Sequence, residues 1–234
     1  MSKIKFYIII LILKIALLNE VPNSFDWREK NIIGIVQSQG LASWLEPLTG
    51  MLESLYDIGK GNYVYFSKQM LLDCVPQSSD FIGDQIPNAL NWIIKNGITK
   101  DSDYPYKGVK GICKSSKYID MKVTKYRKLG PNADEEEMKQ LLYENGPFII
   151  LLNSNPLITY SAGILDLDEI KCPSSGINQA FLLVGYGSSA GKDYWIVKSS
   201  FGKIWGEKGY FRIIRGKGAC GINKSAFIPF VEFE

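Results

Sequence analysis

The chain has 234 residues, of which 46% are hydrophobic and 12% aromatic, and its formal net charge is +3 at pH 7. A chain of this length can bury a substantial core and is too short for more than one or two compact domains. Lys3, Lys5, Lys14 and Glu20 lie in an N-terminal segment that we expect to be removed, and its removal leaves a charge close to zero (3 − 3 + 1 = +1). This balance gives no reason to expect a nucleic acid or an anionic membrane as a partner.

The first 20 residues, MSKIKFYIIILILKIALLNE, predict a secretory signal peptide. Two early lysines precede an apolar run over residues 6–18, which is too short to span a bilayer. Lys14 interrupts the run and no small-residue cleavage motif follows it, so an uncleaved anchor or a mis-assigned first exon is the alternative. We therefore expect a protein that is secreted or lies in the endolysosomal lumen, whose domain spans residues 21–234.

The four cysteines predict two disulfides in a secreted chain. They form no CxxC motif and have no histidine partner, so we expect neither a metal nor another cofactor. Spacing alone leaves all three possible pairings open. The cysteines are Cys74, Cys113, Cys172 and Cys220.

Four segments predict helices, three of them in the first half of the chain. Apolar residues recur at helical spacing over 44–56, and a short helix over 67–72 has Ser67 as its cap. A third helix over 89–96 ends before Gly97, and a fourth is capped by Asn132 or Asp134 and ends before Gly146.

Strand patterns dominate the second half of the chain. The runs FIILLN, QAFLLVGYG, DYWIVKSS and GYFRIIRG are short, rich in β-branched and aromatic residues, and separated by glycines. They predict an antiparallel sheet or barrel. With no repeat, heptad pattern or low-complexity linker, the chain reads as an α+β fold with two lobes.

Several motifs occur in an order that resembles the papain-like cysteine proteases, the cathepsin family, from about Val21 to the C-terminus. These motifs are VPNSFDWREK, QSQG, FSKQMLLDC, YPY, SAGI, GYG, DYWIVKSSFGKIWGEKGYFRI and GACGI. The resemblance implies a helical lobe over about 28–126 plus the C-terminal end, a β-barrel-like lobe over about 127–225, and a cleft between them.

The same resemblance implies a disulfide pattern. Cys74 should pair with Cys113, and Cys172 with Cys220, each within one lobe. A third bridge of the family joins the turn before the nucleophile to a GCNGG stretch, which here reads DFIGD. Both of its cysteines are absent, the second being replaced by Phe81.

The three catalytic positions of the family are all changed. Ser43 stands before Trp44 where the family has its cysteine nucleophile, and Gln179 stands in NQA where it has its histidine. Ser199 takes the place of the asparagine that orients the histidine ring, and Phe201 that of the tryptophan that shields it. The resemblance thus implies where the site lies and that its reactive groups are missing.

The composition strengthens this conclusion because the chain contains no histidine. A serine hydroxyl needs a base to take its proton, and such help is worth roughly 10²-fold to 10⁴-fold. Gln179 is a neutral amide and cannot supply it. Lys198 is the nearest lysine along the sequence, but it alternates with Val197 and Ser199 on a predicted strand and should point away from the site.

Other positions of the cleft are kept or altered. Gln39 matches the family's oxyanion-hole glutamine, with stabilisation of its turn as the alternative role. Asp84 replaces a glycine at the cleft rim, where Trp205 is retained and is interpreted as a packing residue. Pro47 lies four residues after Ser43, so either the helix begins later than Ser43 or its first turn is distorted.

We expect a secreted pseudoprotease that is not an enzyme and acts as a binding or decoy protein. Its partners would be peptides, proteins or protease inhibitors in the cleft, without nucleic acid or membrane, and the protein would be a monomer. A weak or atypical peptidase that uses Ser43 with Gln39 is the alternative. The triplet Asn223-Lys224-Ser225 is a possible glycosylation site.

Overall fold

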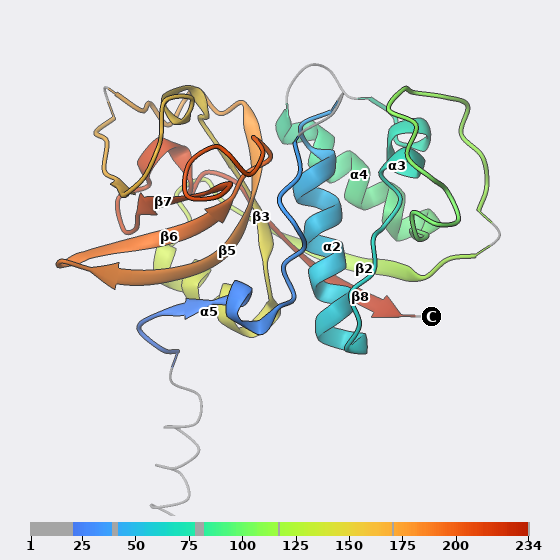
Figure 1. The fold of residues 1–234 in the computed structure, drawn as a ribbon, viewed down its shortest axis with the longest axis horizontal. Helices are drawn as coiled ribbons and strands as arrows, with labels where there is room; N and C mark the ends of the chain where they lie inside the picture. Colours follow the sequence, from blue (N-terminus) through green and yellow to red (C-terminus); the bar gives the residue numbers. More distant parts are fainter. Residues whose placement is uncertain (1–20, 39–41, 78–81, 117, 170, 234) are drawn as a thin grey trace, which may run out of the picture.

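The structure is a computed structural model that describes residues 21–38, 42–77, 82–116, 118–169 and 171–233 (Figure 1). The predicted signal peptide, the glutamine Gln39 and the substituted Phe81 lie outside these residues.

The helical lobe contains three α-helices that lie side by side (Figure 1). They are α2 (Leu45–Lys60), α3 (Lys68–Cys74) and α4 (Ile82–Asn96). The predicted cap of α3 is confirmed, since Ser67 Oγ accepts a hydrogen bond from the Met70 amide at 2.9 Å. A fourth helix, α5 (Glu135–Asn145), belongs to the β lobe, and of its two candidate caps Asp134 is the one used.

Helix α4 is longer than the sequence predicted. The sequence predicted a helix over residues 89–96 that ends before Gly97. The structure continues the helix back through Pro87 to Ile82. Ile86, Leu90 and Ile93 are fully buried on one face of this helix. Burial of that face offsets the backbone hydrogen bond that Pro87 cannot donate.

The β lobe is built on one sheet of eight strands in the order β2-β8-β3-β5-β6-β7-β4, with β1 paired to β5. All pairs are antiparallel except β4 with β7, so the sheet is mixed rather than purely antiparallel. The α+β class is confirmed, as are the four predicted strands. The bounds are β1 Phe25–Asp26, β2 Met121–Leu129, β3 Phe148–Leu152, β4 Ile164–Leu165, β5 Gln179–Ser189, β6 Lys192–Lys198, β7 Tyr210–Ile214 and β8 Ala226–Phe233, with short 3-10 turns at Trp27–Lys30, Asn155–Leu157 and Ala219–Gly221.

Strands β2 and β8 form a long ribbon that the sequence analysis missed. Met121 pairs with Phe233 at one end and Leu129 with Ala226 at the other. The ribbon runs from the β lobe beneath the helical lobe, where β8 passes beside α2 (Figure 1). It therefore joins the two lobes, and β2 begins before the boundary expected at residue 127.

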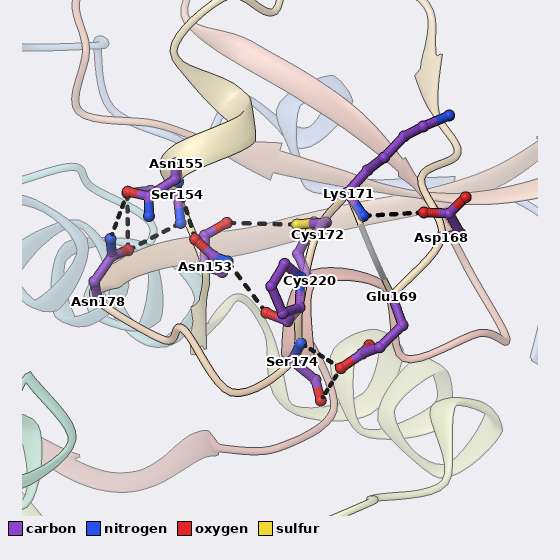
Figure 2. Close-up of a disulfide and its surroundings, with 11 residues drawn as sticks. Asn153, Ser154, Asn155, Asp168, Glu169, Lys171, Cys172, Ser174, Asn178 and Cys220 are labelled. Carbon is purple, nitrogen blue, oxygen red and sulfur yellow. Dashed lines mark hydrogen bonds between the residues drawn. A yellow bond between two sulfur atoms is a disulfide. The ribbon is translucent and has the colours of Figure 1, made fainter.

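Both disulfide pairings implied by the resemblance are confirmed. Cys74 at the end of α3 pairs with Cys113, and Cys172 pairs with Cys220 in the β lobe. Asn153 lies beside the second bridge, where its Nδ2 donates to the Pro173 carbonyl at 3.1 Å (Figure 2). This bridge and its neighbours hold the loop that leads into β5.

Candidate functional site

Ser43 lies just outside helix α2. The helix begins at Leu45 with Trp44 as its N-cap residue, and the Leu48 amide donates to the Trp44 carbonyl at 3.2 Å. Pro47 is the third helical residue, in the turn where backbone amides have no intrahelical acceptor. Its missing N–H therefore costs the helix nothing. Of the two arrangements that the sequence left open, the helix that begins later is the one found.

Gln179 and Ser199 lie at facing ends of β5 and β6, next to Ser200. Gln179 Nε2 donates a hydrogen bond to Ser200 Oγ at 3.3 Å, and both residues are buried. Ser199 Oγ accepts from the Phe201 amide at 3.1 Å. The Ser199 hydroxyl is thus hydrogen-bonded to the backbone of the turn that follows it.

The start of α2 faces these two strand ends across a small pocket. The segment before the helix is held there by a bridge between Ser38 and Phe201. The ionisable groups lining the pocket, within the described residues, are Glu46 and Lys198. The expectation that Lys198 points away from the site was therefore wrong. The pocket is lined by Gln37, Glu46, Pro47, Ala180, Leu182, Lys198, Ser199 and Ser200.

A polar network positions Gln179 through the residue before it. Asn178 Oδ1 accepts hydrogen bonds from both the backbone amide and the hydroxyl of Ser154, at 2.9 and 2.8 Å. Its Nδ2 donates to Asn155 Oδ1 at 3.0 Å (Figure 2). These bonds fix the entry to β5, so the side chain at position 179 leaves the backbone in a defined direction.

The remaining sequence-predicted residues that the structure describes are not among those that line this pocket. Asp84 is exposed in the first turn of α4, and it is absent from the pocket lining given above. Trp205 is half-buried, with its Nε1 donating to the Leu157 carbonyl at 3.2 Å and its ring 4.9 Å from that of Phe201. This agrees with a packing role. Asn223 is half-buried and its Nδ2 donates to the Ala133 carbonyl at 3.4 Å.

The structure also shows a polar cluster that sequence reasoning missed. Glu53 of α2 is only 4% exposed and accepts hydrogen bonds from Tyr63 Oη at 2.5 Å and the Phe66 amide at 3.1 Å. Lys198 of β6 donates to the Gly34 carbonyl at 2.8 Å. We call Gly34, Glu53, Tyr63 and Lys198 the interlobe cluster, because it joins the helical lobe, the segment before α2 and the β sheet.

Burial determines the ionisation of the interlobe cluster. Removal from water raises the pKa of Glu53 above its ordinary value, although the Tyr63 hydroxyl acts in the opposite direction. Burial likewise lowers the pKa of Lys198 to about 8, against the attraction of Glu53 and Glu46. In each group desolvation outweighs the opposite charge nearby. The only sequence signal was a glutamate on the apolar face of a predicted helix.

We expect alanine at Gly34 to destabilise the fold by about 1–3 kcal/mol, the typical cost of overpacking. A Cβ atom at this position would lie 1.9 Å from Tyr63 Oη. Urea unfolding measures the loss, and Gly50→Ala is the control because its added Cβ would make an ordinary 3.6 Å contact with Leu182. Equal midpoints for wild type and Gly34→Ala would contradict the prediction.

The lowered pKa of Lys198 predicts a rise of stability between about pH 8 and the ordinary lysine pKa of 10.5. Below pH 8 the folded and unfolded chains both hold this proton, and burial of the charge opposes folding. Above pH 8 the folded chain releases it while the unfolded chain retains it, so the penalty is relieved by at most about 1.4 kcal/mol per pH unit. Melting temperatures of wild type and Lys198→Met at pH 7.5 to 9.5 test this, since only the wild type should gain. Parallel curves would disprove it.

The part of the chain that the structure describes lacks two further features. It holds no group of three or more cysteine, aspartate or glutamate side chains placed to bind a metal ion. None of its helices is long and apolar enough to cross a membrane.

Comparison with known proteins extends the resemblance over the whole folded part. The sequence profile described as papain family cysteine protease matches residues 21–230. The chain is 36% identical over 209 residues to a viral cathepsin of Adoxophyes honmai nucleopolyhedrovirus, covering 88% of this chain and 60% of that protein. It is 35% identical to cathepsin F of Drosophila melanogaster over 217 residues, or 88% of this chain and 35% of that protein. The chain thus spans less than two thirds of the length of these relatives.

Solved structures show the same fold. Digestive procathepsin L2 from Tenebrio molitor superposes with a TM-score of 0.78 at 32% identity, covering 90% of this chain and 68% of that one. Bromelain from Ananas comosus, in complex with the E64 inhibitor, gives a TM-score of 0.75 at 31% identity, covering 91% of this chain and all of that one (100%).

Proposed function

This chain belongs to the papain family of cysteine proteases, and we propose that it binds ligands in its cleft without cleaving peptides. One observation carries the proposal: the full sequence contains no histidine. Papain-like catalysis depends on a histidine that activates the nucleophile and returns its proton to the leaving group. The relatives carry the names of proteases, so this chain would differ from them in activity rather than in fold.

The local geometry supports the proposal. Gln179 stands at the histidine position and donates its amide hydrogen to Ser200. The hydroxyl of Ser199, at the position of the orienting asparagine, accepts from the Phe201 amide. Ser43 therefore has no catalytic partner of the family type in either place, and its hydroxyl keeps its ordinary weak reactivity.

The proposed role is that of a secreted monomeric binding or decoy protein. Its cleft would hold peptides, proteins or inhibitors of active papain-like proteases. The two disulfides support an oxidising compartment, where such bridges persist. Because the fold is retained while the reactive groups are replaced, recognition is the property of the family that this chain could keep.

A weak peptidase that uses Ser43 is the second candidate. It is favoured by Lys198, whose pKa of about 8 would suit a general base. Lys198 lines the same small pocket as Ser199 and Ser200, but its ammonium donates to the Gly34 carbonyl. That bond holds the ammonium in the interlobe cluster.

An assay with fluorogenic peptides distinguishes the two candidates. Wild type and Ser43→Ala should both show no turnover, with bromelain as the active control. Turnover by the wild type that Ser43→Ala abolishes would establish the peptidase. Binding is then measured with immobilised protein inhibitors of papain-like proteases, where competition by unlabelled peptide would place the contact in the cleft. Absence of binding to both inhibitors and peptides would leave the binding role without support.

A further inference from the structure

One segment of the helical lobe exposes an unusual amount of apolar surface. Nine large apolar side chains are exposed among the described residues, and four of them fall between residues 106 and 118. Ile112 is 85% exposed and Val109 is 63% exposed, with Tyr106 at 42% and Tyr118 at 56%. Exposed apolar groups gathered in this way indicate an interaction surface.

The segment is held rigidly from beneath, so this exposure is not the result of a loose loop. The Cys74–Cys113 disulfide ties it to the end of α3. Gln69 Nε2 donates to the Val109 carbonyl at 2.7 Å, and Asp73 Oδ1 accepts from the Gly111 amide at 2.6 Å. Two side chains of α3 thus bind the backbone of the segment, and the apolar side chains are turned outward.

The same segment is strongly basic. Residues 104–116 contain Lys107, Lys110 and Lys114 and no acidic residue. All three lysines are exposed, and the ion pairs found among the described residues include none of them. Burial acts to raise the pKa of Asp73, which lies beneath, but hydrogen bonds from the Gly111 amide, Tyr104 and Gln69, together with the nearby charge of Lys107, hold it below the ordinary value. Its oxygens are therefore occupied by the segment itself.

A hollow of about 320 Å³ opens beside two of these lysines. Lys107 and Lys114 line it together with the hydroxyl-bearing Ser115 and Ser116 and with the carboxylate of Asp103. Ammonium and hydroxyl groups are donors that suit an oxyanion such as a phosphate group. The arrangement combines outward apolar side chains with exposed cations.

We propose that residues 104–116 form a docking surface for an anionic phospholipid membrane. Val109 and Ile112 enter the boundary between headgroups and acyl chains, and the three lysines contact lipid phosphates. Apolar side chains that project singly between lysines suit a fluid lipid surface, which closes around each of them. The segment lies at the edge of the helical lobe away from the β lobe, so docking leaves the start of α2 uncovered (Figure 1).

The net charge of the whole chain does not reveal this local group of lysines. The near-zero charge predicted for the processed chain gave no reason to expect a membrane partner. Electrostatic attraction to a surface decays within about 10 Å at ordinary salt, so the local excess of three lysines decides the outcome. The proposal does not depend on whether the cleft cleaves peptides.

Sedimentation with vesicles tests the proposal on the full chain. Binding should be strong to phosphatidylcholine vesicles that contain about one third phosphatidylserine, absent with phosphatidylcholine alone, and weakened by salt. Replacing Lys107, Lys110 and Lys114 by glutamine should reduce the partition coefficient about a hundredfold, at about fivefold for each lysine. Ile112→Asp should reduce it at least tenfold.

Matched controls separate local docking from general effects of charge or folding. Ile204→Asp changes another isoleucine that is fully exposed (101%), and Lys122, Lys125 and Lys128 changed together to glutamine remove the same charge from β2. Both controls should bind vesicles like the wild type. The proposal would be overturned if the controls lost as much vesicle binding as the test variants. It would also be overturned if binding did not depend on phosphatidylserine, or if the wild type did not bind. Capture of an acidic peptide by the same lysines without vesicle binding would also overturn it, by assigning the surface to a protein.

Discussion

Alanine at Glu53 is expected to lower the free energy of unfolding by about 3–5 kcal/mol, the range for breaking a buried charged contact. The change removes the acceptor for Tyr63 Oη and for the Phe66 amide. It also removes the carboxylate that most favours the charged form of Lys198. A partly buried ammonium and two donors then lose their partner together.

Three further variants test this explanation. Glu53→Gln keeps an acceptor for the Phe66 amide and should lose less stability than Glu53→Ala. Adding Lys198→Met to Glu53→Ala should recover part of the loss, because no uncompensated ammonium then remains. Glu144→Ala, on the exposed face of α5, is the surface control and should stay within about 0.5 kcal/mol of wild type. If the losses of Glu53→Ala and Lys198→Met simply add, the two groups are not coupled.

The sequence predicted those parts of the fold where one pattern dominates. Ser67 was identified as a helix cap, and Asp134 as one of two candidates with Asn132, because a short polar side chain precedes each helix. The four glycine-bounded strands stood out by composition. The sequence did not predict strand β2, which carries exposed side chains over much of its length. Lys125, Arg127 and Lys128 break its apolar alternation, and a bulge between Val123 and Lys125 shifts its register. The pairing of β2 with β8 joins distant segments and leaves no local signal.

The sequence indicated which residues belong to the candidate site, but it did not predict the contacts that surround them. The absence of histidine is evident from the composition, and the motifs around Gln179 and Ser199 assigned these residues to family positions. The contacts that now hold those side chains, Ser200 for Gln179 and the Phe201 amide for Ser199, depend on how the strands end. The sequence could not predict the interlobe cluster for another reason. Its members come from distant segments, and the bond from Lys198 ends on a backbone carbonyl.

A cysteine at position 43 should remain an ordinary thiol until a histidine is supplied. In Ser43→Cys alone we expect a thiol pKa of about 8.5, because the neutral Gln179 offers no charge to stabilise a thiolate. In Ser43→Cys with Gln179→His, the thiol pKa should fall by at least about 2 units, as in other cysteines paired with a cationic histidine. The fixed entry to β5 at Asn178 and the facing starts of α2 and β5 are the structural reasons to expect that the new ring reaches the thiol.

The rate of alkylation by iodoacetamide between pH 4 and pH 10 measures both pKa values. The double variant should react with a midpoint well below that of the single variant, and its rate at pH 6 should exceed that of Ser43→Cys by about a hundredfold. Gln179→His without the cysteine is the control and should react no faster than wild type. A pKa near 8.5 in both cysteine variants would mean that the geometry of the cleft, and not only its chemistry, has been lost. A lowered pKa would show that the site was inactivated by substitution alone, with the two lobes still holding the reactive positions together.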